Sequence, residues 1–425
     1  MIAVLFISFV LLIVLGVPIA FAMLIAGGLA VAVSDSVPLP LIAQRVGSGT
    51  DNFTYLAIPL FILAGSIMER TGIATRLVAL AKALVGHIRG GMGQVVIVSE
   101  IFFSGISGAS LSDASAISSI MYPTLRQSGY RDDRAVALIS AACAMGILIP
   151  PCLTMVVLGA IAGVSVSALF IAGFLPGLLM AVALMALVYT QSRQGLLPGG
   201  EAKASWRETW IAFRRSIAPL MLPVIIFGGI LGGIFSPTEA AAVAVFYAAV
   251  VAFAYRELTS RMFYEILVET AMITGAVGLI LGAASGFSTL LALEGVPDRV
   301  GAFITGLSSN PILFLILVNL TFMIFGAILD GIPALLLFLP IFLPVSASLG
   351  IDPLHFTLLS VASLGVGLVL PPIGIMLLVV CSVTKTPLGA VSRAMLPYLG
   401  ILALCLLLII AVPEIVLVLP RAFGL

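Results

Sequence analysis

The sequence predicts an all-α polytopic membrane protein made of two inverted repeats, each with a re-entrant helical hairpin and a broken helix. Three observations predict this fold class. Hydrophobic residues make up 62% of the chain and charged residues only 9%, whereas a soluble domain carries about 25% charged residues. One pattern of glycines and prolines occurs twice at a constant offset. Basic residues concentrate in opposite loops of the two copies.

The apolar residues form runs of the length that a bilayer requires. Ile2–Val33, Ile217–Phe235 and Leu399–Val412 are long or dense enough to span or nearly span a membrane. The start of the chain lacks a basic region and a small-residue cleavage site, so we expect a retained span there. The lipid bilayer is therefore the expected environment, and no nucleic-acid partner is expected.

The repeat relates positions that lie 221 residues apart, as Gly105 and Gly326 do. Every proline between positions 105 and 179 has a proline partner at this offset. The matched pairs are Gly105 with Gly326, Pro123 with Pro344, Gly129 with Gly350, Gly146 with Gly367, Pro150 and Pro151 with Pro371 and Pro372, Met155 with Met376, and Pro176 with Pro397. We therefore place one repeat at 1–190 and the other at 216–425, joined by a cytoplasmic linker at 191–215.

The first repeat begins with spans that the sequence leaves open. Gly16 and Pro18 interrupt the run 2–33, which forms either one kinked helix or two short spans; the repeat favours two. A polar segment at 34–52 and a span at 54–68 follow. Basic residues at helical spacing in 69–89 predict an amphipathic helix on the membrane surface.

A hairpin at about 92–126 and a broken helix at about 135–162 come next. The apolar run 92–103 is too short to cross a membrane, and a Gly/Ser-rich tip at 104–113 separates it from a second short arm. Such a tip is tolerated at membrane depth only where protein or a wet cavity covers it. The double proline after Gly146 removes two backbone donors and frees carbonyls one turn earlier. A span at 168–189 closes the repeat.

The second repeat follows the same order. We predict spans near 216–235, 239–255 and 266–290, a connector at 291–310, a hairpin at about 311–347, a broken helix at about 355–384 and a final span at about 394–419. Ser236 and Glu239 have the spacing of a capping box, with Pro237 at the first helical position. Glu239 is therefore expected to be structural.

The distribution of Lys and Arg predicts that the repeats are inverted. Segments 70–89 and 124–134 carry seven basic residues, whereas their repeat partners 291–310 and 345–355 carry only Arg299. The loop after the broken helix shows the reverse, because 163–172 has none and 384–393 has two. Short cytoplasmic loops are enriched in basic residues. Equivalent loops are therefore expected to face opposite sides.

Inverted repeats with broken helices are typical of secondary transporters, which bind their substrate and ions near the middle of the membrane. Half-helix N-termini attract anions, and carbonyls freed by glycine and proline can coordinate Na⁺. The candidate ion- and substrate-binding residues of the first repeat are Ser104, Ser107, Gly108, Ser110, Asp113, Gly146, Pro150, Pro151 and Thr154. Those of the second repeat are Gly326, Asp330, Gly331, Pro333, Gly367, Pro371, Pro372 and Gly374.

Structural alternatives stay open at these positions. Asp113 can cap the second hairpin arm instead of binding an ion, the serines can satisfy the backbone of the tip, and Asp330 can cap or pack. Glu100 fits either a proton relay or a hydrogen-bonded packing role. The double prolines can be plain kinks. The four cysteines, Cys143, Cys152, Cys381 and Cys405, are expected to be small buried hydrophobes.

Enzymatic alternatives find little support. Neither histidine belongs to an H-E-x-x-H pair, and no lysine follows a glycine, so zinc-protease and Walker A motifs are absent from the sequence. An intramembrane hydrolase using Ser107 or Ser110 needs a base near its nucleophile, and no histidine lies close in sequence. No catalytic residue and no cofactor are therefore expected, apart from Na⁺ as coupling ion.

A series of motifs covering nearly the whole chain resembles the large membrane subunit of tripartite ATP-independent periplasmic (TRAP) transporters. The motifs are IPLFILAGSIME (58–69), SGISGASLSDASAI (104–117), GILIPP (146–151), FSPTEAAA (235–242), ILDGIPALL (328–336) and LPPIG (370–374). The resemblance implies a multi-pass protein of the bacterial inner membrane with an elevator-type ion-transporter fold. It also implies sodium sites at the hairpin tips and helix breaks.

The same resemblance implies a function and partners. A sodium gradient drives uptake of an organic acid, such as a C4-dicarboxylate or sialic acid, which a periplasmic binding protein delivers. A small four-helix membrane subunit completes the complex, and we expect it as a separate chain. A stand-alone sodium- or proton-coupled anion symporter of the related dicarboxylate family is the alternative. Proton coupling through Asp113, Asp330 or Glu100 also stays open.

Overall fold

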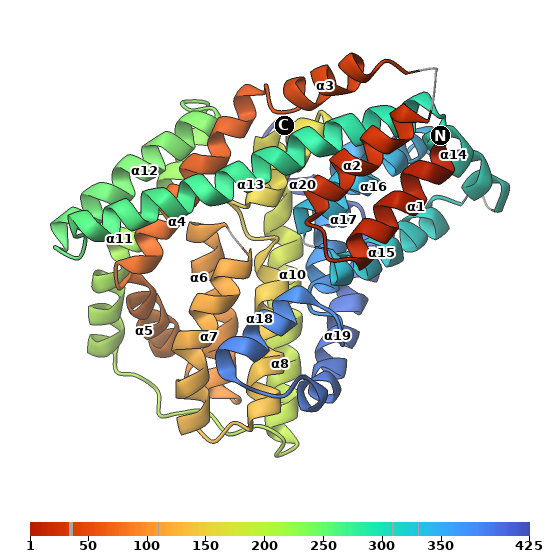
Figure 1. The fold of residues 1–425 in the computed structure, drawn as a ribbon. Helices are drawn as coiled ribbons and strands as arrows, with labels where there is room; N and C mark the ends of the chain where they lie inside the picture. The colour runs from red at the N-terminus through yellow and green to blue at the C-terminus, as the bar shows by residue number, and fades with distance from the viewer. Residues whose placement is uncertain (34–36, 109, 308–309, 330) are drawn as a thin grey trace.

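The chain folds into helices packed around two broken helices at its centre (Figure 1). The computed structural model describes residues 1–33, 37–108, 110–307, 310–329 and 331–425. Helices account for 81% of the structure and the described residues contain no strand, which confirms the predicted all-α class. Eight of the described helices are long and apolar enough to cross a membrane, which confirms a polytopic membrane protein.

The first half of the chain contains eleven of the described helices. They are α1 (Ile2–Val14), α2 (Ile19–Ala32), α3 (Leu39–Ser48), the 3-10 helix η1 (Phe53–Leu56), α4 (Ala57–Arg70), α5 (Ile73–Val85), α6 (Gly91–Ser107), α7 (Ser110–Gln127), α8 (Asp132–Gly146), α9 (Leu153–Ala162) and α10 (Val166–Arg193). Helices α6 and α7 form a hairpin in the range predicted for one. Helices α8 and α9 are the two parts of a broken helix.

The second half contains ten further described helices. They are α11 (Trp206–Leu231), α12 (Pro237–Ala254), α13 (Ser260–Leu293), α14 (Val296–Leu307), α15 (Pro311–Ile328), α16 (Gly331–Ser348), α17 (Pro353–Gly367), α18 (Ile375–Thr384), α19 (Leu388–Ala411) and α20 (Glu414–Ala422). A hairpin, a broken helix and a long helix thus follow one another in both halves. Their inverted orientation across the membrane remains a prediction from the charge pattern.

The upstream parts of the two broken helices form the core. Every residue of α8 from Ala135 to Gly146 is buried, and so is every residue of α17 from His355 to Gly367. Helices α6 and α7 pack against α8, whereas α15 and α16 pack against α17. The long α13 crosses one end of the molecule, with α11 and α12 near its start and α1 and α2 beside its later turns (Figure 1).

The polar segment 34–52 and the connector 291–310 contain helices that the sequence analysis missed. Helix α3 packs on α13, where Gly282 and Gly286 let the two backbones come close. A Cβ atom on Gly282 would lie only 2.8 Å from the carbonyl oxygen of Val46. This tertiary contact gives a short polar helix its packing partner. Helix α14 packs in the same way against α16.

Segment 2–33 forms the two helices that the repeat favours, and they pack against each other across a turn at 15–18, where Gly16 has a φ of +80°. Two predicted boundaries differ from the structure. The linker predicted at 191–215 is shorter, because a capping box between Ser205 and Glu208 starts α11 ten residues before the predicted span. The span predicted at 394–419 is wrong: α19 ends at Ala411, and α20 begins after Pro413.

Basic side chains of the predicted surface helix form ion pairs with acidic residues of the second half and of the linker. Arg70 pairs with Glu269 of α13, Arg76 pairs with Glu257 at 2.8 Å, and Lys82 pairs with Glu201 at 2.9 Å. Such partly exposed pairs each contribute about 0–1 kcal/mol, so they fix the positions of α5 and of the end of α4 more than they stabilise the fold. Its location at a membrane surface remains a prediction.

Substitutions at two glycines test the packing of α10 against the first break. Gly173 is buried, and a Cβ atom there would overlap the Leu148 carbonyl oxygen and lie 2.9 Å from the Met155 methyl carbon. We expect Gly173→Ala to lower the melting temperature in detergent, at a cost of about 1–3 kcal/mol. Gly275→Ala is the control, because nothing lies within 4 Å of its added Cβ atom. Equal melting temperatures for the two variants would contradict this packing.

Candidate ion and substrate site

The first hairpin tip contacts the first helix break through backbone groups. Gly108 ends α6 in the left-handed conformation, with a φ of +66°, and its carbonyl accepts a hydrogen bond of 3.1 Å from the Leu153 amide. The Ser104 hydroxyl donates a 2.7 Å hydrogen bond to the Gly146 carbonyl. A Cβ atom on Gly146 would lie 2.8 Å from the Ser104 hydroxyl oxygen and would also overlap Glu100. A larger residue at this position would have to displace the Glu100 and Ser104 side chains.

The first break contains backbone carbonyls that are buried inside the protein. Ile149, Pro150 and Pro151 are buried, and their carbonyls accept no hydrogen bond from the described part of the chain. The peptide bond between the two prolines is cis. Buried carbonyls without donors are unfavourable, at about 1–3 kcal/mol each, and carbonyls of this kind coordinate Na⁺ in transporters with broken helices. A role of these carbonyls in sodium binding remains a prediction.

The second hairpin is packed on the second break by the same residue types. A Cβ atom on Gly326 would lie 3.1 Å from the Leu364 carbonyl oxygen, and one on Gly331 would lie 3.0 Å from the Leu364 side chain. A Cβ atom on Gly367 would lie 2.9 Å from the Met323 Cα atom. Glycine thus lets the backbones of α15 and α17 approach each other closely.

The two breaks differ in burial and in how their downstream helices begin. The Leu153 amide of α9 is bound by the hairpin tip, whereas the Met376 amide of α18 donates to the Leu368 carbonyl of its own break at 3.1 Å. Pro371 and Pro372 also form a cis peptide, but Pro372 is exposed while Pro151 is buried. The second break is therefore the more open of the two.

Both hairpins and both breaks meet in one region. Helix α9 packs against α16 and α17, and α18 packs against α7 and α8, so each half contacts the break of the other. A Cβ atom on Gly365 would lie 2.8 Å from the carbonyl oxygen of Ala144, which shows how closely α17 approaches α8. The candidate residues predicted from two distant parts of the sequence thus belong to one central assembly (Figure 1).

Several of the remaining candidates lie in first helical turns around this assembly. Asp113 of α7 is buried with 1% of its surface exposed, Thr154 of α9 is buried, and Pro333 of α16 is buried. Gly374 precedes the first residue of α18. Asp330 lies outside the described residues, as do the side chains of Ser107 and Ser110. Binding roles for all of these residues remain predictions.

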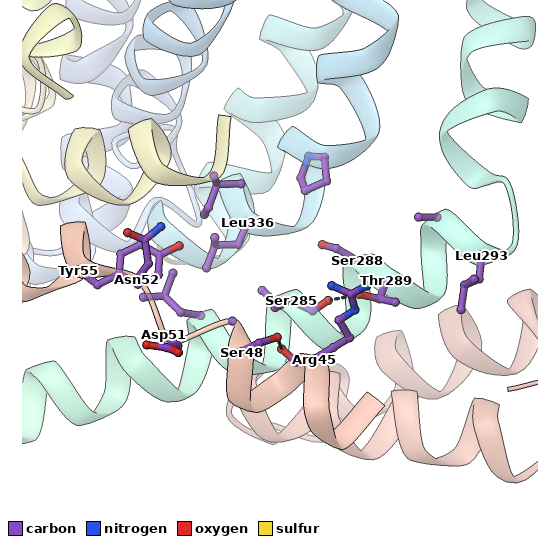
Figure 2. Close-up of a pocket in the computed structure, with 16 residues that line it drawn as sticks. Arg45, Ser48, Asp51, Asn52, Tyr55, Ser285, Ser288, Thr289, Leu293 and Leu336 are labelled. Atoms are coloured by element: carbon purple, nitrogen blue, oxygen red, sulfur yellow. Dashed lines mark hydrogen bonds between the residues drawn. The ribbon is translucent and has the colours of Figure 1, made fainter. Parts of the chain in front are cut away.

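The sequence analysis missed a cavity of about 710 Å³ beside this assembly. Helices α3 and α13 form one side of the cavity, and α9 and α16 contribute Ile161, Leu336 and Pro340 to the other. Its polar lining consists of Arg45, Ser48, Asp51, Asn52, Tyr55, Ser285, Ser288 and Thr289 (Figure 2). The sequence did contain a signal for this cavity, because the spacing of Ser285, Ser288 and Thr289 places three hydroxyls on one face of a largely apolar helix.

Comparisons with known proteins define the family. Residues 6–415 match the family described as "Tripartite ATP-independent periplasmic transporter, DctM component". The chain is 37% identical to the sialic acid TRAP transporter large permease protein SiaM of Vibrio cholerae, over 96% of both chains. It is also 37% identical to the C4-dicarboxylate TRAP transporter large permease protein DctM of Pseudomonas aeruginosa, over 94% of both chains.

The fold agrees with that of a solved transporter. The YdaH transporter of Alcanivorax borkumensis superposes with a TM-score of 0.63 over 88% of both chains, at 16% sequence identity. Together with the family match, this shows a membrane transport protein. The chain belongs to the DctM family of TRAP transporter large permease subunits, and its place is the bacterial inner membrane.

Replacement of Ser104 tests the contact between the first tip and the first break. Ser104→Ala removes the hydrogen bond to Gly146, which contributes about 1 kcal/mol, so we expect uptake by the complete transporter to fall about fivefold. Ser140→Ala is the matched control, since the buried Ser140 hydroxyl bonds only the Val136 carbonyl of its own helix, at 2.9 Å. A drop of the same size in the control would assign the effect to general destabilisation.

Proposed function

We propose that this chain is the translocating subunit of a sodium-driven importer of an organic acid. A periplasmic binding protein delivers the acid, and a small membrane subunit associates as a separate chain. Membership of the TRAP permease family supports this proposal, as do two relatives named for sialic acid and for C4-dicarboxylates. The observation that carries it is the first break, with buried acceptor carbonyls beside a hairpin tip.

The chemistry of the central assembly fits a carboxylate and a cation bound together. The carbonyls of Pro150 and Pro151 can replace part of the hydration shell of Na⁺. The dipole of α9 places partial positive charge at the N-terminus of this helix, beside the first break, and this charge favours a nearby anion. A sodium ion and a carboxylate then neutralise each other, which lowers the energy of moving both through a region of low dielectric constant.

Movement of the central assembly against the rest of the protein would complete the cycle. We propose that both hairpins and both broken helices (α6–α9 and α15–α18) slide as one body, and that α1–α4 and α11–α13 form the stationary frame. Close packing of α4 with α12 and of α13 with α2, α3 and α4 supports a frame of this composition. The close approach of α17 to α8 supports a single moving body.

Reconstituted uptake tests the proposed energy source. We expect vesicles that contain this chain and its small subunit, supplied with the binding protein, to accumulate a carboxylate only with an inward sodium gradient. The panel should include N-acetylneuraminate and succinate, with a sodium ionophore as the control that collapses the gradient. Uptake that follows a pH gradient and ignores sodium would make the sodium assignment wrong.

Asp113 provides a test at the level of a single residue. If its carboxylate contributes to ion binding, Asp113→Asn should raise the sodium concentration for half-maximal uptake about tenfold or more, because one charge–charge interaction is lost. Asp352→Asn is the control, since Asp352 accepts hydrogen bonds from two N–H groups at the start of α17 and asparagine caps equally well. An unchanged sodium dependence in Asp113→Asn would assign this residue to helix capping.

A further inference from the structure

The cavity between α3, α13, α9 and α16 has one cationic side chain at one end. Figure 2 shows the Arg45 side chain directed toward Ser285, Ser288 and Thr289, while Asp51 lies at the other end beside Asn52 and Tyr55. Within the described residues, the Arg45 guanidinium has no acidic group within 4 Å and makes no hydrogen bond. Its five donors are therefore open to a ligand.

The side chains around Arg45 have the chemistry of a carboxylate site. Ser285, Ser288 and Thr289 are half-buried, and each hydroxyl can donate one hydrogen bond. The Thr289 hydroxyl donates to the Ser285 carbonyl at 2.9 Å, which leaves those of Ser285 and Ser288 for a ligand. A guanidinium binds a carboxylate in a bidentate manner, and neighbouring hydroxyls add to its specificity.

The position of the cavity connects it to the central assembly. Leu336 and Pro340 belong to the second arm of the second hairpin, and Ile161 belongs to the helix after the first break. Arg45 and the hydroxyls lie on α3 and α13, which belong to the proposed frame. Figure 1 places α3 at the opposite end of the molecule from the α10–α11 connection, which the charge pattern predicts to be cytoplasmic. The cavity thus faces the predicted periplasmic side.

We propose that Arg45, Ser285 and Ser288 form a receiving site that binds the carboxylate of the arriving organic acid before it enters the central assembly. The proposal rests on the proposed function, because it assigns an entry site to the same substrate. The far end of the cavity, with Asp51, Asn52 and Tyr55, faces the remainder of the acid, where hydroxyl or amide groups of the substrate find hydrogen-bond partners. Arg45 is a binding residue of the frame and does not travel with the substrate.

Charge-selective labelling tests this site without any transported substrate. Ser288→Cys is placed in the otherwise unchanged chain, and the wild-type chain serves as blank, since its four cysteines are buried. The complex is held in phosphatidylcholine nanodiscs. The labelling rates of the anionic reagent 2-sulfonatoethyl methanethiosulfonate and of the cationic 2-(trimethylammonio)ethyl methanethiosulfonate are then compared.

We expect Arg45→Gln to lower the anionic-to-cationic rate ratio about fivefold, since a positive charge near the thiol acts oppositely on the two reagents. Arg45→Lys keeps the charge and should preserve the ratio, which guards against misfolding as the cause. Arg207→Gln is the matched control, because Arg207 is also exposed and unpaired among the described residues but lies on α11. A ratio that is unchanged in Arg45→Gln, or lowered equally in Arg207→Gln, would overturn the proposal.

Two further measurements distinguish the proposed carboxylate site from a lipid headgroup site and from failure of the proposed function. Phosphatidylglycerol added to the nanodiscs lowers the anionic labelling rate through its surface charge alone, so the decrease is compared between the chain with Arg45 and Arg45→Gln. Equal decreases are expected; a much larger decrease with Arg45 present would identify a lipid headgroup site and overturn the carboxylate assignment. In reconstituted uptake, Arg45→Gln should raise KM for the acid several-fold with a smaller effect on the maximal rate.

The outcomes separate the receiving site from the proposed function. Uptake that is independent of sodium would overturn the proposed function and leave the labelling ratio intact. Sodium-driven uptake with an unchanged ratio would overturn the receiving site alone.

Discussion

The structure depends on the close approach of two buried backbone segments, a hairpin tip and a helix break. Ser104 and Gly108 supply a hydroxyl and a carbonyl from the tip, and these satisfy groups on both sides of the first break. Glycine is required at Gly367, because a Cβ atom there would collide with the backbone of Met323, whereas at Gly146 a Cβ atom would have to displace the Glu100 and Ser104 side chains. Non-helical backbone inside a membrane is tolerated only when it is buried in this way or lines a wet cavity.

The two pairs of hairpin tip and helix break differ in the group that caps the downstream helix. In the first pair the hairpin caps the downstream helix, so the tip and the break hold each other in place. In the second pair the break caps its own downstream helix through Leu368, and Pro372 remains exposed. Among the described residues, the two downstream helices therefore begin with different hydrogen-bond partners.

Much of the central assembly was predictable from the sequence because local backbone chemistry determines it. The double prolines at 150–151 and 371–372 end helices wherever they occur, and their repetition at a fixed offset identifies them as paired features. The all-helical class and the family followed from composition and from motifs. Helix α3, the early start of α11 and the cavity were missed. Helix α3 depends on the contact of Val46 with Gly282, which no local pattern reveals, whereas the capping box at Ser205 was a signal that went unused.

The most direct test of the central claim is a high-resolution cryo-electron microscopy map of the complete transporter in sodium with a bound carboxylate. The account predicts ion density within coordination distance of the Pro150 and Pro151 carbonyls, with the carboxylate next to the hairpin tips. Loss of that density on replacement of sodium by choline would complete the result. Ion density elsewhere, with unchanged helix breaks in both conditions, would contradict the account.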